Sequence, residues 1–115
     1  FDFWYRPAVF YQKPSIRIKR IEDKKYKLVR IAEPTMYNKI NCVEVNYSIF
    51  VEEIRTKVLN SFKESHLVRH FSLKDLDSLA STHGFERVHA EEFMTKKKLS
   101  KKTWSACVIL KKRKI

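Results

Sequence analysis

The segment FSLKDLDSLASTHG, residues 71–84, has the signals of a complete α-helix. Ser72 is a favourable N-cap, and Asp75 three positions later forms a capping-box-like pattern with it. One apolar stripe at helical spacing follows, formed by Leu73, Leu76, Leu79 and Ala80. Gly84 then falls where a left-handed residue ends a helix without steric cost. We therefore expect a helix that begins after Ser72 and ends at His83.

The residues before this helix predict an antiparallel meander. Alternating apolar and polar side chains predict strands over residues 16–19, 26–32, 41–53 and 58–70. Pro34 is expected to end the second strand, because proline lacks the N–H that a sheet needs. The third strand places its apolar residues on one face, which is typical of a sheet with one packed and one wet face. Those residues are Val43, Val45, Tyr47, Ile49 and Val51.

The two ends of the chain complete the expected fold. After the helix, 85–93 and 103–110 predict a hairpin around the basic loop at 96–102. At the start, FDFW resembles the end of a buried strand, and residues 8–13 form either a helical turn or an extended connection. We predict an α+β fold with a mostly antiparallel sheet, built from a meander of three or four strands, one main helix and a C-terminal hairpin.

Composition limits the possible settings of the chain. Its 115 residues suffice for one domain, and much of the net charge of +12 comes from residues 96–115. Such a cluster is more typical of a solvated segment than of a nucleic-acid contact. No apolar run approaches the roughly 20 residues that cross a membrane. Cys42 and Cys107 each lie in an apolar strand pattern, so we expect structural thiols and a reducing compartment, the cytoplasm.

The sequence has no self-contained catalytic motif. Phosphate-binding and dinucleotide-binding loops need clustered glycines, and Gly84 is the only glycine of the chain. His66 and His70 lie four residues apart, but no third ligand is close in sequence, so we expect no metal site. Because the chain also begins at Phe1 within a strand-like pattern, we expect it to be part of a longer protein.

Six segments, in order, resemble the C-terminal portion of class I S-adenosylmethionine-dependent methyltransferases. They are FDFWY, RIAEP, VEVNY, ESHLVRHFSLKDLDSLASTHGF, HAEEFMT and TWSACVILKK. The family pattern E-x-H-x-M-R-x-F is matched by Glu64, His66, Arg69 and Phe71. Two positions depart from it: Val68 replaces the methionine, and His70 stands where an aromatic residue is common. The resemblance is to small-molecule methyltransferases with an antiparallel lid.

The resemblance implies a division of the chain and a set of roles. Residues 1–14 would be the end of a parallel core strand with its connection, 15–70 a lid-like insertion, and 71–115 the last helix and hairpin of a Rossmann-like fold. S-adenosylmethionine would bind upstream, so we expect no cofactor on this segment alone, and no activity. The residues expected to contact a small-molecule methyl acceptor are Trp4, Tyr5, Arg6, Tyr47, His66 and Arg69. No general base is assigned.

Alternatives remain open for these residues and for the chain. Trp4, Tyr5 and Tyr47 also suit a core, and His66 with Arg69 can tie the lid to the helix. The chain could instead be a basic binding module for RNA or another polyanion, or a structural or dimerisation domain. Unpaired strand edges would favour association between copies.

Overall fold

The computed structural model describes residues 1–114. Its contacts divide the chain into two compact units. The terminal unit consists of residues 1–13 together with the chain from Arg69 onward, and the inserted unit of residues 14–68. The two ends of the chain therefore fold together, and the middle of the sequence forms a separate structure.

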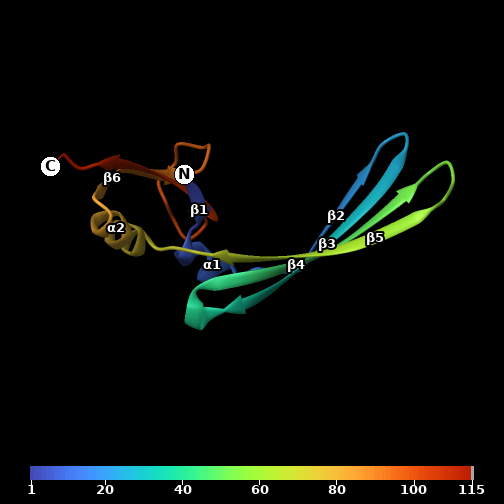
Figure 1. The fold of residues 1–115 in the computed structure, drawn as a ribbon, viewed down its shortest axis with the longest axis horizontal. Helices are drawn as coiled ribbons and strands as arrows, with labels where there is room; N and C mark the ends of the chain where they lie inside the picture. Colours follow the sequence, from blue (N-terminus) through green and yellow to red (C-terminus); the bar gives the residue numbers. More distant parts are fainter. Residues whose placement is uncertain (115) are drawn as a thin grey trace. The chain divides into compact units, whose positions relative to one another are not determined.

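The terminal unit is a small antiparallel sheet with two helices (Figure 1). Its elements are β1 (Asp2–Trp4), α1 (Arg6–Gln12), α2 (Leu73–Thr82), β6 (Phe85–Glu92) and β7 (Ser105–Lys112). The strand order is β1-β7-β6, so the last strand of the chain lies between the other two, antiparallel to both. The predicted C-terminal hairpin is confirmed, with a register shift between Arg87 and His89.

The core of the terminal unit joins the sheet to α2. Phe3, Leu76, Ala106 and Val108 form its buried cluster, and Phe71 packs against it. The rings of Phe3 and Phe71 meet edge to face, with centroids 6.2 Å apart. Burial of each large apolar side chain contributes roughly 1.5–3 kcal/mol, so this cluster is the main source of cohesion in the unit.

Helix α2 is capped as its sequence predicts. The Ser72 hydroxyl accepts a hydrogen bond from the backbone N–H of Asp75 at 3.1 Å. Gly84 follows the helix with a φ of +79°, the left-handed conformation expected of a C-terminal stop. The apolar stripe is narrower than predicted, because Leu79 is 42% exposed while Leu76 and Ala80 are buried. Contact with the sheet therefore follows the i, i+4 line of the helix.

Helix α1 resolves the alternative left open for residues 8–13. Pro7 lies in its first turn, where a missing backbone N–H is tolerated, and Ala8 and Val9 are fully buried. The helix ends at Gln12, and the next residue, Lys13, has a φ of 59° and precedes Pro14. The connection is thus helical, not extended.

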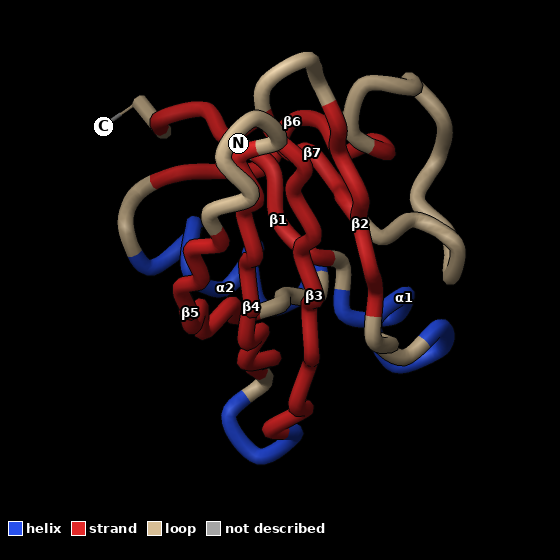
Figure 2. The backbone as a smooth tube through the Cα atoms, turned by 90° about the vertical axis from the view of Figure 1, so that its right-hand side faces the viewer, coloured by secondary structure: helices blue, strands red, loops and turns tan. Residues whose placement is uncertain are grey.

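The inserted unit is the predicted meander. Its strands are β2 (Arg17–Glu22), β3 (Tyr26–Tyr37), β4 (Cys42–Glu53) and β5 (Leu59–Arg69), in the order β2-β3-β4-β5. A short 3-10 turn, η1 (Asn38–Ile40), joins β3 to β4. Figure 2 shows the strands of the chain as red tubes. The α+β class with a mostly antiparallel sheet is confirmed.

The predicted end of the second strand is wrong. β3 continues through Pro34, which pairs with Val45, and reaches Tyr37. The pairing of β2 with β3 extends only to Ala32, so β3 has an open edge at Pro34. Proline has no backbone N–H to donate. At an open edge no neighbouring strand needs that donor, so no hydrogen bond of the sheet is lost.

Burial along β4 also differs from the predicted alternation. Val43 and Val45 are buried, but Tyr47, Ile49 and Val51 are only half-buried, as are polar residues on the other face. The thiols differ as well, since Cys42 is buried and Cys107 half-buried; both are free. In the described part of the chain, neither helix is long and apolar enough to cross a membrane.

Candidate functional site

A hollow of about 370 Å³ lies on the inserted sheet on the face that carries Tyr47. We call it the Arg30 hollow. Its lining residues are Arg30, Tyr47, Ile49, Glu64, His66 and Val68. In the β3–β4 register Arg30 is opposite Ile49 and Ala32 opposite Tyr47. Directly opposite residues share a face of a sheet, so Arg30 and Tyr47 are diagonal neighbours on one face.

Tyr47 is the centre of this hollow. Its ring meets His66 edge to face, with centroids 5.5 Å apart. The guanidinium carbon of Arg30 lies 5.3 Å from the centre of the same ring, within the range of a cation–π contact. His66 Nε2 in turn lies 3.2 Å from a carboxylate oxygen of Glu64. Three strands thus bring an arginine, a phenol and an imidazole together.

Arg30 is incompletely satisfied in this arrangement. Its Nε is buried and has no hydrogen-bond partner. Among the described residues, none of the ion pairs involves Arg30. A buried donor without an acceptor costs about 1–3 kcal/mol, so this contact with the Tyr47 ring is made at the expense of an unsatisfied N–H.

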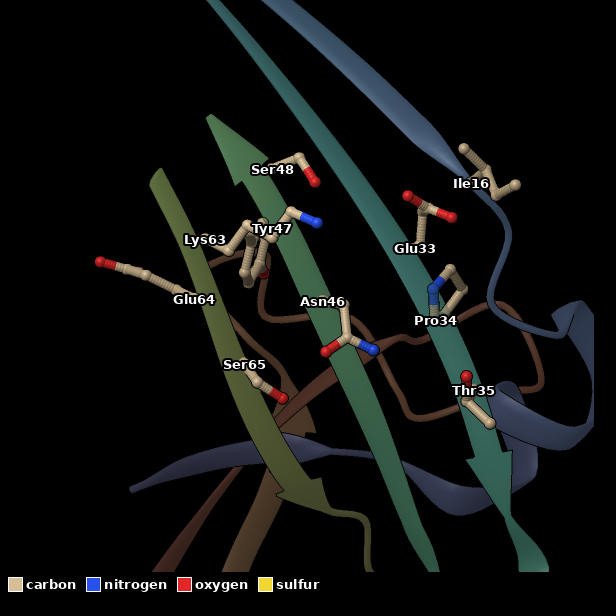
Figure 3. A pocket seen from close by; sticks show the side chains of 10 residues that line it. All are labelled: Ile16, Glu33, Pro34, Thr35, Asn46, Tyr47, Ser48, Lys63, Glu64 and Ser65. Carbon is tan, nitrogen blue, oxygen red and sulfur yellow. The ribbon is translucent and has the colours of Figure 1, made fainter. Parts of the chain in front are cut away.

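The inserted sheet has a second, polar groove of about 470 Å³, which shares the lining residues Tyr47 and Glu64 with the Arg30 hollow (Figure 3). Figure 3 shows Glu33, Asn46 and Ser65 projecting from three neighbouring strands. The amide nitrogen of Asn46 donates to a carboxylate oxygen of Glu44 at 3.2 Å. The polar lining is suited to hydrogen bonds with hydroxyl or amine groups.

The terminal unit contains a buried polar network around His70. The Arg6 side chain donates from Nε to His70 Nδ1 at 3.1 Å and from a terminal nitrogen to the His70 carbonyl oxygen at 3.0 Å. Arg6 also forms an ion pair with Asp75, in the first turn of α2. His70 is fully buried, with the ring of Phe10 edge-on at 5.3 Å between centroids. This network ties α1 to the start of α2.

The network also determines the charge state of His70. Burial, and secondly the nearby Arg6 cation, lower the pKa of His70 below its ordinary value of 6.5. The imidazole is therefore neutral near pH 7. Since Nδ1 accepts from Arg6, the ring proton is on Nε2, and that atom is buried without a partner.

The other residues predicted at the acceptor make structural contacts within the terminal unit. The Trp4 ring packs against Trp104 at 5.1 Å between centroids. Tyr5 is half-buried and packs against the core cluster. Arg69 is exposed, with its guanidinium carbon 4.9 Å from the centre of the Phe71 ring.

The structure thus brings two of the six predicted site residues, Tyr47 and His66, into direct contact. Trp4, Tyr5 and Arg6 are consecutive in the terminal unit. Sequence reasoning missed Arg30 and His70. A signal for Arg30 was present, because it interrupts the apolar period-two pattern between Leu28 and Ala32. The one signal for His70 was that it stands where the family pattern commonly has an aromatic residue.

No residue of the chain is assigned to a cofactor. The single glycine, Gly84, ends α2 and has no close neighbours around it, so it does not form a phosphate or adenosine cradle. The clustered glycines that such a cradle requires are absent from this sequence.

No protein-family model and no curated protein sequence matches the chain. Solved structures match its fold. An S-adenosylmethionine-dependent methyltransferase from Clostridium acetobutylicum ATCC 824 superimposes with a TM-score of 0.77 at 17% identity, covering 99% of this chain and 44% of that one. The sugar N-methyltransferase KedS8 from Streptoalloteichus sp. gives 0.65 at 14% identity, covering 96% and 40%.

A third match was solved with its cofactor. CalS10, an amino pentose methyltransferase from Micromonospora echinaspora solved with S-adenosylmethionine bound, gives a TM-score of 0.58 at 12% identity, covering 82% of this chain and 36% of that one. The chain therefore spans less than half the length of each of these proteins. Its fold is that of part of S-adenosylmethionine-dependent methyltransferase structures, as the sequence resemblance predicts.

Proposed function

We propose that the chain is the C-terminal, acceptor-side portion of an S-adenosylmethionine-dependent methyltransferase that acts on a small molecule. The observation that carries the proposal is the match over 99% of this chain to 44% of a methyltransferase, at a TM-score of 0.77. The ordered sequence segments that resemble the same family support it independently. The cofactor would then be held by the part of the protein that this chain does not span.

The Arg30 hollow is the proposed acceptor surface. Methyl transfer is an in-line displacement at the sulfonium methyl group, so the protein mainly orients the acceptor and excludes water. Tyr47 supplies a flat ring and a hydroxyl, and His66 supplies an imidazole held by Glu64. Two structural neighbours act on an amino pentose and a sugar, which makes amine-bearing sugars the first acceptors to test.

Arg6 has a different proposed role. It is a positioning residue, since its side chain binds the buried His70 and the α2 residue Asp75. Trp4, Tyr5 and Arg69 remain proposed acceptor-side residues, and each also has a packing contact that explains it.

The free thiols Cys42 and Cys107 support a reducing compartment, the cytoplasm.

The test uses the chain joined to its natural upstream coding segment. Release of S-adenosylhomocysteine is measured with a panel of amine-bearing sugars. We expect Tyr47→Leu to raise KM for the sugar with kcat changed less, because the ring binds the acceptor rather than reacting. Phe50→Leu is the matched control, because Phe50 lies on the opposite face of the same strand and is 44% exposed. Equal effects of the two variants would remove the acceptor role from the Arg30 hollow.

We also propose that copies of the chain associate through open strand edges. Every residue of β2 is exposed, and β2 is an edge strand of its sheet. Such an edge offers unpaired N–H and C=O groups to another strand. Polyanion binding is the alternative function, and it would use the basic loop at 96–102. We do not favour this alternative.

A further inference from the structure

Two cations lie side by side on the face of the inserted sheet that bears Tyr47. Lys19 of β2 is directly opposite Arg30 of β3, so their side chains share this face. Like charges in directly opposite positions destabilise a sheet. The residue opposite Arg30 on its other side is Ile49, which offers no compensating charge.

No carboxylate of the described residues forms an ion pair with either cation. The Arg30 hollow contains one acid, Glu64, and its carboxylate lies 3.2 Å from His66. Neither Lys19 nor Arg30 takes part in any ion pair of the described chain. With Lys19 beside it, the hollow therefore has two cations against one carboxylate, Glu64, together with an apolar lining of Ile49 and Val68.

The guanidinium of Arg30 is also held in place before any ligand arrives. Tyr47 lies 5.3 Å below it, and the Arg30 Nε is buried without an acceptor. An arginine fork binds the oxygens of a carboxylate or phosphate through parallel hydrogen bonds. Because Nε itself is buried, a ligand oxyanion would bind the terminal nitrogens of the guanidinium, and its charge would offset the repulsion between Arg30 and Lys19.

We propose that the Arg30 hollow binds an oxyanion of the methyl acceptor, a carboxylate or a phosphate, with Arg30 as its principal ligand. The proposal rests on the proposed function in taking this hollow as the acceptor side. It adds that the acceptor carries a negative charge, recognised by Arg30 and attracted by Lys19.

The experiment is a two-dimensional ¹H–¹⁵N NMR titration of the 115-residue chain with inorganic phosphate and, separately, with acetate. The Nε–H signal of Arg30 and the backbone signals of Tyr47 and Ile49 are followed at constant ionic strength. We expect saturable shifts at these signals. Saturation by phosphate alone assigns a phosphate site, and saturation by acetate alone or by both assigns a site that accepts carboxylates.

Two substitutions remove the same charge from different faces. Arg30→Gln should weaken binding by about tenfold or more, because it removes charge-assisted hydrogen bonds. Arg20→Gln is the matched control, since Arg20 is exposed and opposite Val29, on the other face of the sheet. Lys19 is exposed, and Lys19→Gln leaves Arg30 in place. This variant should weaken binding by about two- to fivefold, because only the attraction between Lys19 and the oxyanion is lost.

Equal weakening by Arg20→Gln and Arg30→Gln would overturn the proposal, as would shifts that never saturate. If Arg30→Gln disturbs the sheet, Lys19→Gln with Arg20→Gln still decides the question. The titration requires no S-adenosylmethionine. Failure of methyl transfer with intact oxyanion binding therefore counts against the proposed function only, and methyl transfer without oxyanion binding counts against this inference only.

Discussion

Replacing Arg6 by methionine should destabilise the terminal unit severely. The Arg6 side chain is 16% exposed and donates hydrogen bonds to Nδ1 and to the carbonyl oxygen of His70. Methionine fills similar space but donates nothing. The variant leaves two acceptors of a fully buried residue without partners, and Asp75 without its counter-ion.

The expected cost follows from these two acceptors. Each buried group left unsatisfied costs about 1–3 kcal/mol, which gives about 2–6 kcal/mol for the pair. The terminal unit contains about 60 residues. A domain of that size has a free energy of unfolding of about 3–9 kcal/mol, so Arg6→Met removes a large part of it.

The chain offers a selective probe and a matched control. Its two tryptophans, Trp4 and Trp104, pack against each other in the terminal unit, so tryptophan fluorescence in a urea titration reports on this unit. Arg69→Met removes the same charge from an exposed side chain over Phe71. It should cost about 0.5–1 kcal/mol, the value of an exposed cation–π contact. A cost for Arg6→Met no greater than that for Arg69→Met would refute the structural role of the His70 network.

Three further predictions concern pH, capping and association. The pKa of His70 is below 6.5 because of burial and Arg6, so the unfolded chain binds the proton more readily. Asp75, which raises this pKa, is the only opposing charge. The stability from neutral His70 is fully present above pH 6.5 and is lost as the pH falls toward the folded-state pKa. Urea titrations between pH 7 and 5 should show this loss. A His70→Phe variant whose free energy of unfolding has the same dependence on pH would contradict the prediction. Ser72→Ala should lower the free energy of unfolding by about 1 kcal/mol, because it removes the hydrogen bond that caps the helix at Asp75. The exposed Ser81→Ala in the last turn of α2 is the control and should not lower it, because alanine favours a helix at least as well as serine. Sedimentation equilibrium should show association between copies of the chain, and Ile18→Lys on the β2 edge should weaken it. Ile109→Lys, at an equally exposed position on a central strand, should leave the association unchanged. A monomer at all concentrations would exclude the edge contact.

Local signals predicted the elements of this fold well. The Ser72 cap, the Gly84 stop and the period-two pattern of residues 41–53 depend on neighbours in the sequence, and the structure has the helix and the strand there. Pro34 misled the prediction because its tolerance depends on where β2 ends, which is a property of strand pairing. The exposure of Leu79 likewise depends on which line of α2 meets the sheet.

The site was less predictable because it depends on register. Tyr47 and His66 were selected from the sequence, and their contact results from the pairing of β4 with β5. The role of Arg30 becomes apparent only when the strand register places it opposite Lys19 on one side and Ile49 on the other. The burial of His70 follows from contacts with Arg6 and Phe10, sixty or more positions away in the sequence, which no local pattern encodes.

The central proposal is that this chain supplies the acceptor side of a methyltransferase whose cofactor site lies in another part of the protein. Calorimetric titration with S-adenosylmethionine tests it most directly, using the 115-residue chain alone and the same chain with its natural upstream coding segment. We predict saturable binding for the longer protein and none for the chain alone. Absence of binding by the longer protein, or equally tight binding by the chain alone, would contradict the proposal.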